Sequence, residues 1–214
     1  MVYDQTACLV DYTYFKGMNE IHLFSSGINV RNFLWEIERY QRAVEVGIFT
    51  KADPIELLEG RLILRPPSDP VHAATVSTLT EYFFRRYLDV YEIRSENPVA
   101  LPPNSEPEPD LVLAKLREDQ YYNAHPGPED LLLVIEVADS TLELDRQVKA
   151  PIYAAANVAE YWIVNLRHRI IEVYLAPDLT QRLYTSVQHY RPGSKFTSPL
   201  LGEVRIDALL LPMK

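Results

Sequence analysis

The sequence has little cysteine and no long apolar run, and each shortage excludes a class of protein. Cys8 is the only cysteine among 214 residues, so no disulfide forms within the chain, and a reducing cytoplasm is the simplest compartment. No apolar run reaches the roughly 18 residues of a membrane-spanning helix, so we expect no membrane partner. The N-terminal segment is broken by Asp4, Asp11 and Lys16 and lacks the cationic start of a secretory signal.

Positive charge is also scarce. The chain has 21 Lys and Arg residues against 30 Asp and Glu residues, a formal net charge of −9. Proteins that coat nucleic acid need clustered Lys and Arg for phosphate contacts, so the balance argues against that class. It is compatible with a metal-dependent enzyme acting on nucleic acid, because such a site gathers carboxylates and the bound cation reverses the local charge.

The order of predicted elements indicates an α/β protein. Helical patterns lie between strands early in the chain, and β-hairpins dominate toward the C-terminus, which is typical of a mixed central sheet flanked by helices. Residues 1–28 show no clear period, and we predict an irregular N-terminal extension there. Residues 29–214 are then predicted to form a single domain.

Turn and cap residues predict the helices. Apolar spacing predicts a helix over residues 29–46 whose buried face carries Phe33, Leu34, Ile37, Tyr40 and Val44. A second helix is expected after Asp69, with that residue as N-cap and Pro70 at the first helical position. A third is expected over residues 141–157, where Pro151 requires a kink or a place in a first turn.

Apolar and β-branched runs predict the strands. A hairpin is expected near Glu59-Gly60, since glycine allows the positive φ of a tight turn. Further strands are predicted over residues 91–101, 111–114, 131–137, 160–164, 169–175, 181–190 and 204–206. The run over 131–137 is nearly all apolar, which is typical of a strand covered on both faces.

Two carboxylates mark the ends of neighbouring predicted strands. Asp110 precedes one strand and Glu136 lies near the end of the next. An ionised carboxylate beside a buried strand needs a partner or a metal, and Mg²⁺ or Mn²⁺ takes one or two carboxylates plus waters and phosphate oxygens. The backbone carbonyl of Val137 is a further candidate ligand. The alternative is structural: Asp110 caps a turn and Glu136 pairs with an arginine or lysine.

Three other polar residues have two interpretations each. Asp145 and Lys149 are four residues apart on a predicted helix, where they either form an exposed ion pair or leave Lys149 pointing back at the metal site. A lysine at the site would stabilise charge on the reacting phosphate. His72, in a first helical turn, is either structural or solvated, or it touches a substrate phosphate or a metal.

A series of short motifs resembles one known family. The chain reads Glu56-Leu-Leu-Glu-Gly60, then Pro109-Asp110, Ile135-Glu136-Val137, Asp145, Lys149, Tyr153 and Glu160-Tyr-Trp-Ile-Val164. In this order it resembles the Uma-type restriction endonuclease family, within the PD-(D/E)XK nuclease superfamily, over roughly residues 30–190. The ordered series is fairly specific, whereas each piece alone is weak.

The resemblance implies a restriction endonuclease-like fold and metal-dependent hydrolysis of phosphodiesters in DNA. By that resemblance Asp110 and Glu136 are the metal-binding acids. The lysine expected two residues after Glu136 is replaced by Ala138, and Lys149 on the following helix takes its place. Glu56 matches an acidic residue of the first motif, either a further metal ligand or a group supporting the ligands.

The leading hypothesis is an endonuclease that uses Mg²⁺ or Mn²⁺. Asp110, Glu136 and Lys149 are the candidate catalytic residues, Val137 and Glu56 further candidate metal ligands, and His72 and Asp145 candidate substrate-binding residues. DNA is the expected substrate, and a homodimer is one assembly the sequence leaves open. Two alternatives remain: a catalytically degenerate binding or assembly module, and a metal phosphohydrolase of small nucleotides. The acidic charge and the proximity of Pro151 to Lys149 favour these alternatives.

Overall fold

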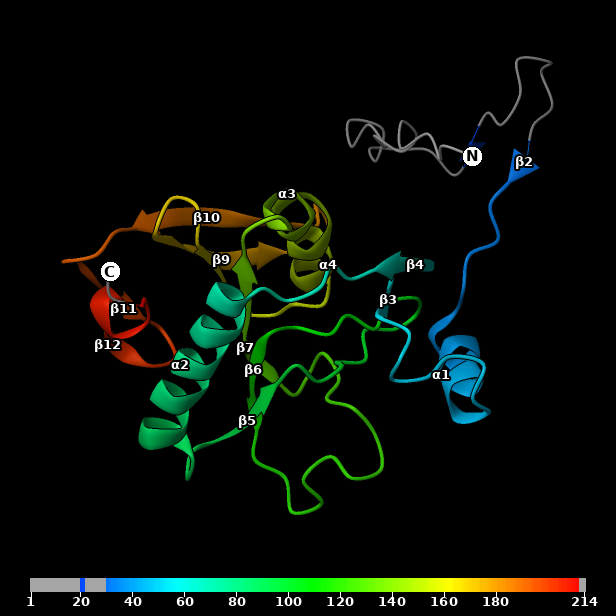
Figure 1. The fold of residues 1–214 in the computed structure, drawn as a ribbon, viewed down its shortest axis with the longest axis horizontal. Helices are drawn as coiled ribbons and strands as arrows, with labels where there is room; N and C mark the ends of the chain where they lie inside the picture. The colour runs from blue at the N-terminus through cyan, green and yellow to red at the C-terminus, as the bar shows by residue number, and fades with distance from the viewer. Residues whose placement is uncertain (1–19, 22–29, 212–214) are drawn as a thin grey trace, which may run out of the picture. The chain divides into compact units, whose positions relative to one another are not determined.

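The computed structural model describes residues 20–21 and 30–211, and the chain divides into two compact units, residues 1–34 and 35–214 (Figure 1). In the first unit β1 (Glu20–Ile21) pairs antiparallel with β2 (Val30–Arg31). The rest of the extension expected over residues 1–28 lies outside the described residues.

A six-stranded sheet forms the centre of the second unit, in the order β10-β9-β8-β7-β6-β5. Its strands are β5 (Tyr91–Ser95), β6 (Leu111–Lys115), β7 (Leu131–Ala138), β8 (Glu160–Asn165), β9 (Ile170–Asp178) and β10 (Leu183–Tyr190). Neighbours are antiparallel except for the parallel pair β7 and β8. The predicted mixed sheet is therefore confirmed.

Each face of the sheet buries its own apolar core. One face packs against α2 (Pro70–Tyr87) and the C-terminal hairpin of β11 (Lys195–Ser198) and β12 (Gly202–Arg205). The helical segment after β7 covers the other face. Successive residues of β7 alternate between the two cores, with Leu133 and Ile135 in one and Val134 in the other. Because both faces are covered, the apolar run of this strand was correctly interpreted.

The segment after β7 contains a wide helical turn next to a proline. It runs through α3 (Leu142–Leu144), a π-helical turn η2 (Asp145–Lys149) and α4 (Ala150–Ala155). Pro151 lies in the first turn of α4, which is one of the two arrangements that the sequence predicted for it. Proline has no N–H to donate four residues back, and the wider turn before it accommodates that loss.

Local signals at the other early elements are also confirmed. Strands β3 (Ile55–Leu58) and β4 (Arg61–Leu64) pair across Glu59-Gly60, both of which have positive φ. The carboxylate of Asp69 accepts hydrogen bonds from the backbone N–H groups of Val71 and His72 and caps α2.

Three predicted boundaries were wrong. The first helix, α1 (Ile37–Glu45), begins at Ile37, because residues 30–31 pair in β2 instead of joining the helix. Phe33 and Leu34 precede the helix and are exposed. Val44, within the helix, is exposed as well, so only Ile37 and Tyr40 of the expected face are buried. Strand β5 ends at Ser95, just before Pro98, which has no N–H for a ladder. The sequence did not indicate β11. After β12 the chain forms a 3₁₀ turn, η3 (Ile206–Ala208), where a strand residue was expected.

None of the described helices combines the length and the apolar character that a bilayer crossing requires.

Candidate active site

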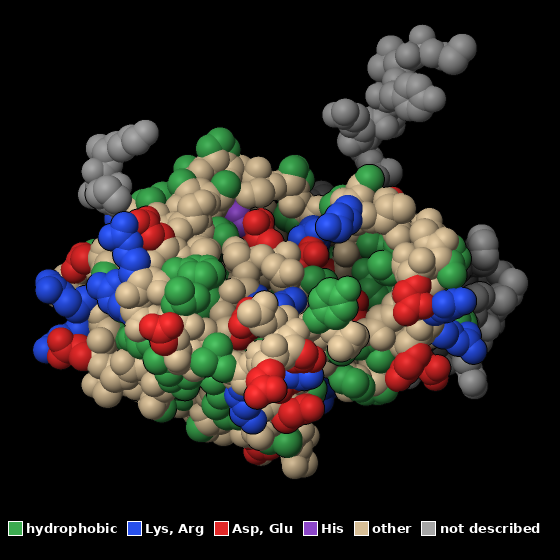
Figure 2. Space-filling model, turned by 90° about the horizontal axis from the view of Figure 1, so that it is seen from below, with side chains coloured by type: hydrophobic (Ala, Val, Ile, Leu, Met, Phe, Trp, Pro, Cys, Tyr) green, Lys and Arg blue, Asp and Glu red, His purple; other side chains and the backbone are tan. Residues whose placement is uncertain are grey.

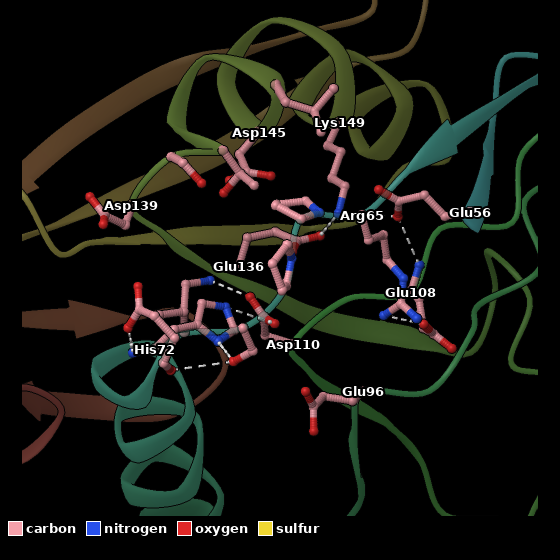
Figure 3. A pocket seen from close by; sticks show the side chains of 18 residues that line it. Glu56, Arg65, His72, Glu96, Glu108, Asp110, Glu136, Asp139, Asp145 and Lys149 are labelled. Atoms are coloured by element: carbon pink, nitrogen blue, oxygen red, sulfur yellow. Dashed lines mark hydrogen bonds and ion pairs between the residues drawn. The ribbon is translucent and has the colours of Figure 1, made fainter. Parts of the chain in front are cut away.

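A small pocket lies where β6 begins and β7 ends, with about 100 Å³ of internal space. The N-terminus of α2, the end of β4 and the turn η2 close its sides (Figure 3). Its charged lining consists of Glu56, Arg65, Asp69, His72, Glu96, Glu108, Asp110, Glu136, Asp139, Asp145 and Lys149. Eight carboxylates thus face two permanently charged basic groups and one histidine, so the pocket is strongly electronegative.

The antiparallel pairing of β6 and β7 brings two of the predicted acids to the same place. Leu111 pairs with Ile135, so Asp110 and Glu136, each one residue further, lie beside one another at the sheet end. The Asp110 carboxylate oxygen Oδ2 accepts a hydrogen bond of 2.6 Å from the backbone N–H of Val137. This contact fixes Asp110 against β7 and orients its other oxygen.

Lys149 lies between two buried acids. Its Nζ is 3.1 Å from Glu136 Oε1 and 3.2 Å from Glu56 Oε2. Asp145 and Lys149 are 1% and 5% exposed, so the interpretation of an exposed helix ion pair is wrong. The wide turn η2 carries both side chains toward the pocket (Figure 3). Glu136 does pair with a lysine, as the structural alternative for this residue expected.

Burial and mutual attraction set the charges of this group. Burial disfavours the Lys149 ammonium, but the Glu136 and Glu56 carboxylates outweigh it and hold the pKa of Lys149 well above its usual value. Burial raises the pKa of Glu136, and the Lys149 ammonium partly offsets this. The Tyr153 hydroxyl donates a 2.7 Å hydrogen bond to Glu136 Oε1. Lys149 is therefore the cation that stabilises the buried acids.

Asp145 is a buried acid without a completed hydrogen bond. Neither of its carboxylate oxygens, both buried, has a partner of hydrogen-bond geometry, although the nearby Thr141 hydroxyl favours the ionised form. Burial raises the pKa of Asp145 to about 6, against the opposing effect of Lys149. A buried, unpartnered carboxylate beside a pocket of acids needs a further cation or a donor.

The substitution Asp145→Asn is expected to stabilise the fold above about pH 6. The raised pKa means that the folded state holds the Asp145 proton more tightly than the unfolded chain, so stability falls as pH rises from 3.8 through about 6. A neutral asparagine side chain removes this penalty, worth up to about 3 kcal/mol at 1.36 kcal/mol per pKa unit. Urea unfolding at about pH 4 and about pH 8 measures it: a gain confined to the higher pH is expected. An equal or lower stability of the variant at pH 8 would contradict the burial argument.

His72 contacts the first acid from the N-terminus of α2. Its Nε2 is 3.3 Å from Asp110 Oδ1, and its Nδ1 is 3.0 Å from the Ser68 hydroxyl. The hydrogen bond to Asp110 raises the pKa of His72, more than burial lowers it. The structure thus brings this predicted residue to the pocket.

Sequence reasoning did not assign Arg65, Asp69, Glu96, Glu108 or Asp139 to the site, although all of them line the pocket. Arg65 forms an ion pair with Glu108 across the pocket wall. The backbone N–H of Glu108 donates to Glu56 Oε2 at 3.2 Å, which joins this pair to Lys149. Arg65 follows a strand directly and precedes two prolines, but no local pattern links it with an acid 43 positions away, so the sequence carries no signal for the pair. By contrast, Tyr153 belongs to the motif series that resembles the family.

The side chains present fit a hard divalent cation. The donors of Asp110 and Glu136 are carboxylate oxygens, the kind that Mg²⁺ and Mn²⁺ prefer, and the unpartnered Asp145 lies in the same pocket. Within the described residues no group of three His, Cys, Asp or Glu side chains is close enough together to enclose a metal. Two carboxylates suffice when waters and substrate complete the shell. The Val137 N–H is engaged by Asp110, and Glu56 is held by Lys149.

Comparison with known proteins agrees with this architecture. The model of the Uma2 family, described as "Putative restriction endonuclease", matches residues 37–209. The crystal structure of a putative nuclease belonging to DUF820, from Anabaena variabilis ATCC 29413, superposes with a TM-score of 0.61 over 82% of this chain and 97% of that one. At 14% identity, that likeness shows the fold. No curated protein is detectably similar in sequence. Since the family model covers most of the chain, the protein belongs to the Uma2 family of restriction endonuclease-like proteins.

Proposed function

We propose that the protein is an endonuclease that hydrolyses phosphodiester bonds of DNA with the help of Mg²⁺ or Mn²⁺. The observation that carries the proposal is the meeting of Asp110, Glu136 and Lys149 in one acidic pocket, from three elements distant in sequence. Membership of the family supports the reaction class.

Asp110 and Glu136 would hold the cation, and the Val137 carbonyl and Glu56 are further candidate ligands. A divalent cation bound there would neutralise phosphate charge and lower the pKa of a water that it coordinates. Asp110 already has one oxygen fixed by the Val137 N–H, so its second oxygen is oriented in advance. The hydrogen bonds that Glu136 receives from Lys149 and Tyr153 both reach Oε1.

Lys149 would stabilise negative charge as it develops on the reacting phosphate. Its ammonium is buried, and its pKa is held high by Glu136 and Glu56, so it stays charged at neutral pH. A fixed charge in a site that excludes water stabilises a transition state more strongly than the same charge in solvent. Asp145 and His72 line the same pocket and would contact substrate or its bound waters.

The residues of the pocket are suited to a DNA substrate, whereas the net negative charge of the protein disfavours DNA binding. The net charge is −9, and Lys and Arg side chains are interspersed with Asp and Glu on the face seen in Figure 2. Binding would therefore depend on the cation at the pocket and on few phosphate contacts. Because the salt dependence of binding grows with the number of phosphate contacts, binding should weaken only modestly with salt. A homodimer would double those contacts.

Plasmid cleavage tests this function. Supercoiled DNA incubated with the protein and Mg²⁺ or Mn²⁺ is expected to be nicked or linearised, and excess chelator is expected to stop the reaction. Equal nicking with chelator would contradict metal dependence, and release of phosphate from nucleotides with intact plasmid would replace DNA by a small substrate. If the protein were inactive with every metal and DNA substrate tested, the catalytically degenerate binding module would be the favoured alternative.

A further inference from the structure

The pocket has two permanently charged basic residues among the described residues that line it, and they differ in availability. Lys149 is 5% exposed and already lies within 3.2 Å of two carboxylates. Arg65 has a side chain that is 35% exposed and a single acidic partner, Glu108. An incoming phosphate would therefore meet Arg65 with less competition than Lys149.

Arg65 also has hydrogen-bonding capacity that the protein leaves unused. Its Nε is buried and has no hydrogen-bond partner, and its ion pair with Glu108 involves Nη1. A guanidinium carries five N–H donors in a planar fork that matches the oxygens of a phosphate. A buried donor left without a partner is costly, and an anion that reached it would remove this cost.

The backbone around Arg65 holds the guanidinium in place. Its N–H donates to the Pro54 carbonyl at 2.7 Å, and Pro66 and Pro67 follow, so the chain has few alternative conformations here. The backbone therefore presents the guanidinium at the pocket wall with its Nε unpartnered.

The pair is linked to the rest of the pocket by direct contacts. The Glu108 N–H donates a hydrogen bond to Glu56, and Glu56 forms an ion pair with the Lys149 ammonium, so both basic groups belong to one connected network (Figure 3). A phosphate bound by Arg65 would be held at a fixed place relative to Lys149. A fixed geometry between the phosphate and the groups that act on it lowers the barrier of the reaction.

We propose that Arg65 binds a phosphate group of the substrate and that Glu108 holds the guanidinium in position until the substrate arrives. The inference rests on the proposed nuclease function, since it assigns the phosphate contact of that same site. Arg65 is a binding residue in this scheme, and Glu108 is a positioning residue.

The test measures binding of a short fluorescent DNA duplex in Ca²⁺, and cleavage of the same duplex in Mg²⁺. Arg65→Ala is expected to weaken binding about tenfold or more and to make the salt dependence shallower by about one phosphate contact. Its KM should rise more than its kcat falls, and its affinity for Mn²⁺ should match that of the wild type. Arg65→Lys should retain part of the binding.

Arg85→Ala is the matched control. Arg85 is an exposed arginine paired with Glu81 on α2, roughly 20 Å further along that helix than His72, so its loss changes net charge equally without touching the pocket. Its variant should bind the duplex within about twofold of the wild type.

Glu108→Gln separates phosphate binding from a purely structural pair. The glutamine amide oxygen can still accept a hydrogen bond from the guanidinium and hold it in position, while the negative charge that competes for Arg65 is gone. Duplex binding should therefore strengthen, opposite to Arg65→Ala. If the pair only held the fold together, both variants would weaken binding in step with melting temperature and leave the salt slope unchanged, and the inference would be overturned. A wild type that binds the duplex without cleaving it would refute nucleolysis alone, and one that does not bind would refute both proposals.

Discussion

Asp110→Asn is expected to lower the rate of DNA cleavage by at least about 1000-fold, because a metal ion contributes several kcal/mol of charge stabilisation in such reactions. The asparagine keeps the shape of the side chain, and its Oδ1 can still accept the Val137 N–H that Asp110 accepts at 2.6 Å. The fold should therefore persist while the charge that attracts the cation is lost. Cleavage assays in Mg²⁺, with melting curves on the same samples, measure both effects.

Asp139→Asn provides the matched comparison. Asp139 lines the same pocket, but its side chain is 46% exposed and paired with Arg167 at 2.9 Å, away from the predicted metal ligands. The same chemical change there should alter cleavage by less than about tenfold, since solvent-accessible ion pairs contribute little. If Asp110→Asn cleaved DNA at the wild-type rate, the assigned role of Asp110 would be contradicted, whatever the cleavage rate of Asp139→Asn.

Lys149→Met is expected to destabilise the fold by about 3–5 kcal/mol near neutral pH, the usual cost of leaving a buried charge unpaired. Methionine fills the space of the lysine stem but leaves the Glu136 and Glu56 carboxylates without the ammonium that lies 3.1 and 3.2 Å from them. Cleavage should be lost as well. Urea unfolding compared between the wild type and the variant measures the stability change.

The pH dependence of this loss has a defined sign. Burial raises the pKa of Glu136 already in the presence of Lys149, so without Lys149 the folded state should hold the Glu136 proton more tightly still. A raised carboxyl pKa costs stability as pH rises above the unfolded value, so the Lys149→Met deficit should shrink toward about pH 5. Added Mn²⁺ should also raise the melting temperature of the variant more than that of the wild type, because a cation can replace the ammonium.

Lys195→Met controls for the loss of a lysine as such. Lys195 is exposed and pairs with Glu203 on the neighbouring strand of the C-terminal hairpin, so its removal should cost less than about 1 kcal/mol. Equal stability of Lys149→Met and the wild type at pH 8 would show that Lys149 does not stabilise the buried acids.

The predictable part of this molecule is the part fixed by local rules. Asp69 and Pro70 predicted the start of α2, and the apolar run around Leu133 predicted a strand covered on both faces. Asp110 and Glu136 were predicted to meet because strand ends of one sheet are neighbours, and the register of β6 and β7 brings them together. Lys149 came from the family resemblance, since spacing alone favoured an exposed helix pair.

The remainder depended on contacts between distant segments. The helical period that predicted a helix from Asn29 could not reveal that Val30 and Arg31 pair with β1, because that pairing is set outside the helix. The pair of Arg65 and Glu108 likewise arises from two loops that meet only in the folded chain. Charged residues in loops show no period, so their partners are decided by the tertiary structure.

Calorimetric titration with Mn²⁺ tests most directly whether the Asp110 and Glu136 carboxylates bind a divalent cation. The wild type is expected to bind Mn²⁺ at neutral pH, and Asp110→Asn and Glu136→Gln are each expected to abolish that binding while Asp139→Asn retains it. Absence of Mn²⁺ binding by the wild type, or binding of equal affinity in all three variants, would contradict a metal site at this sheet end.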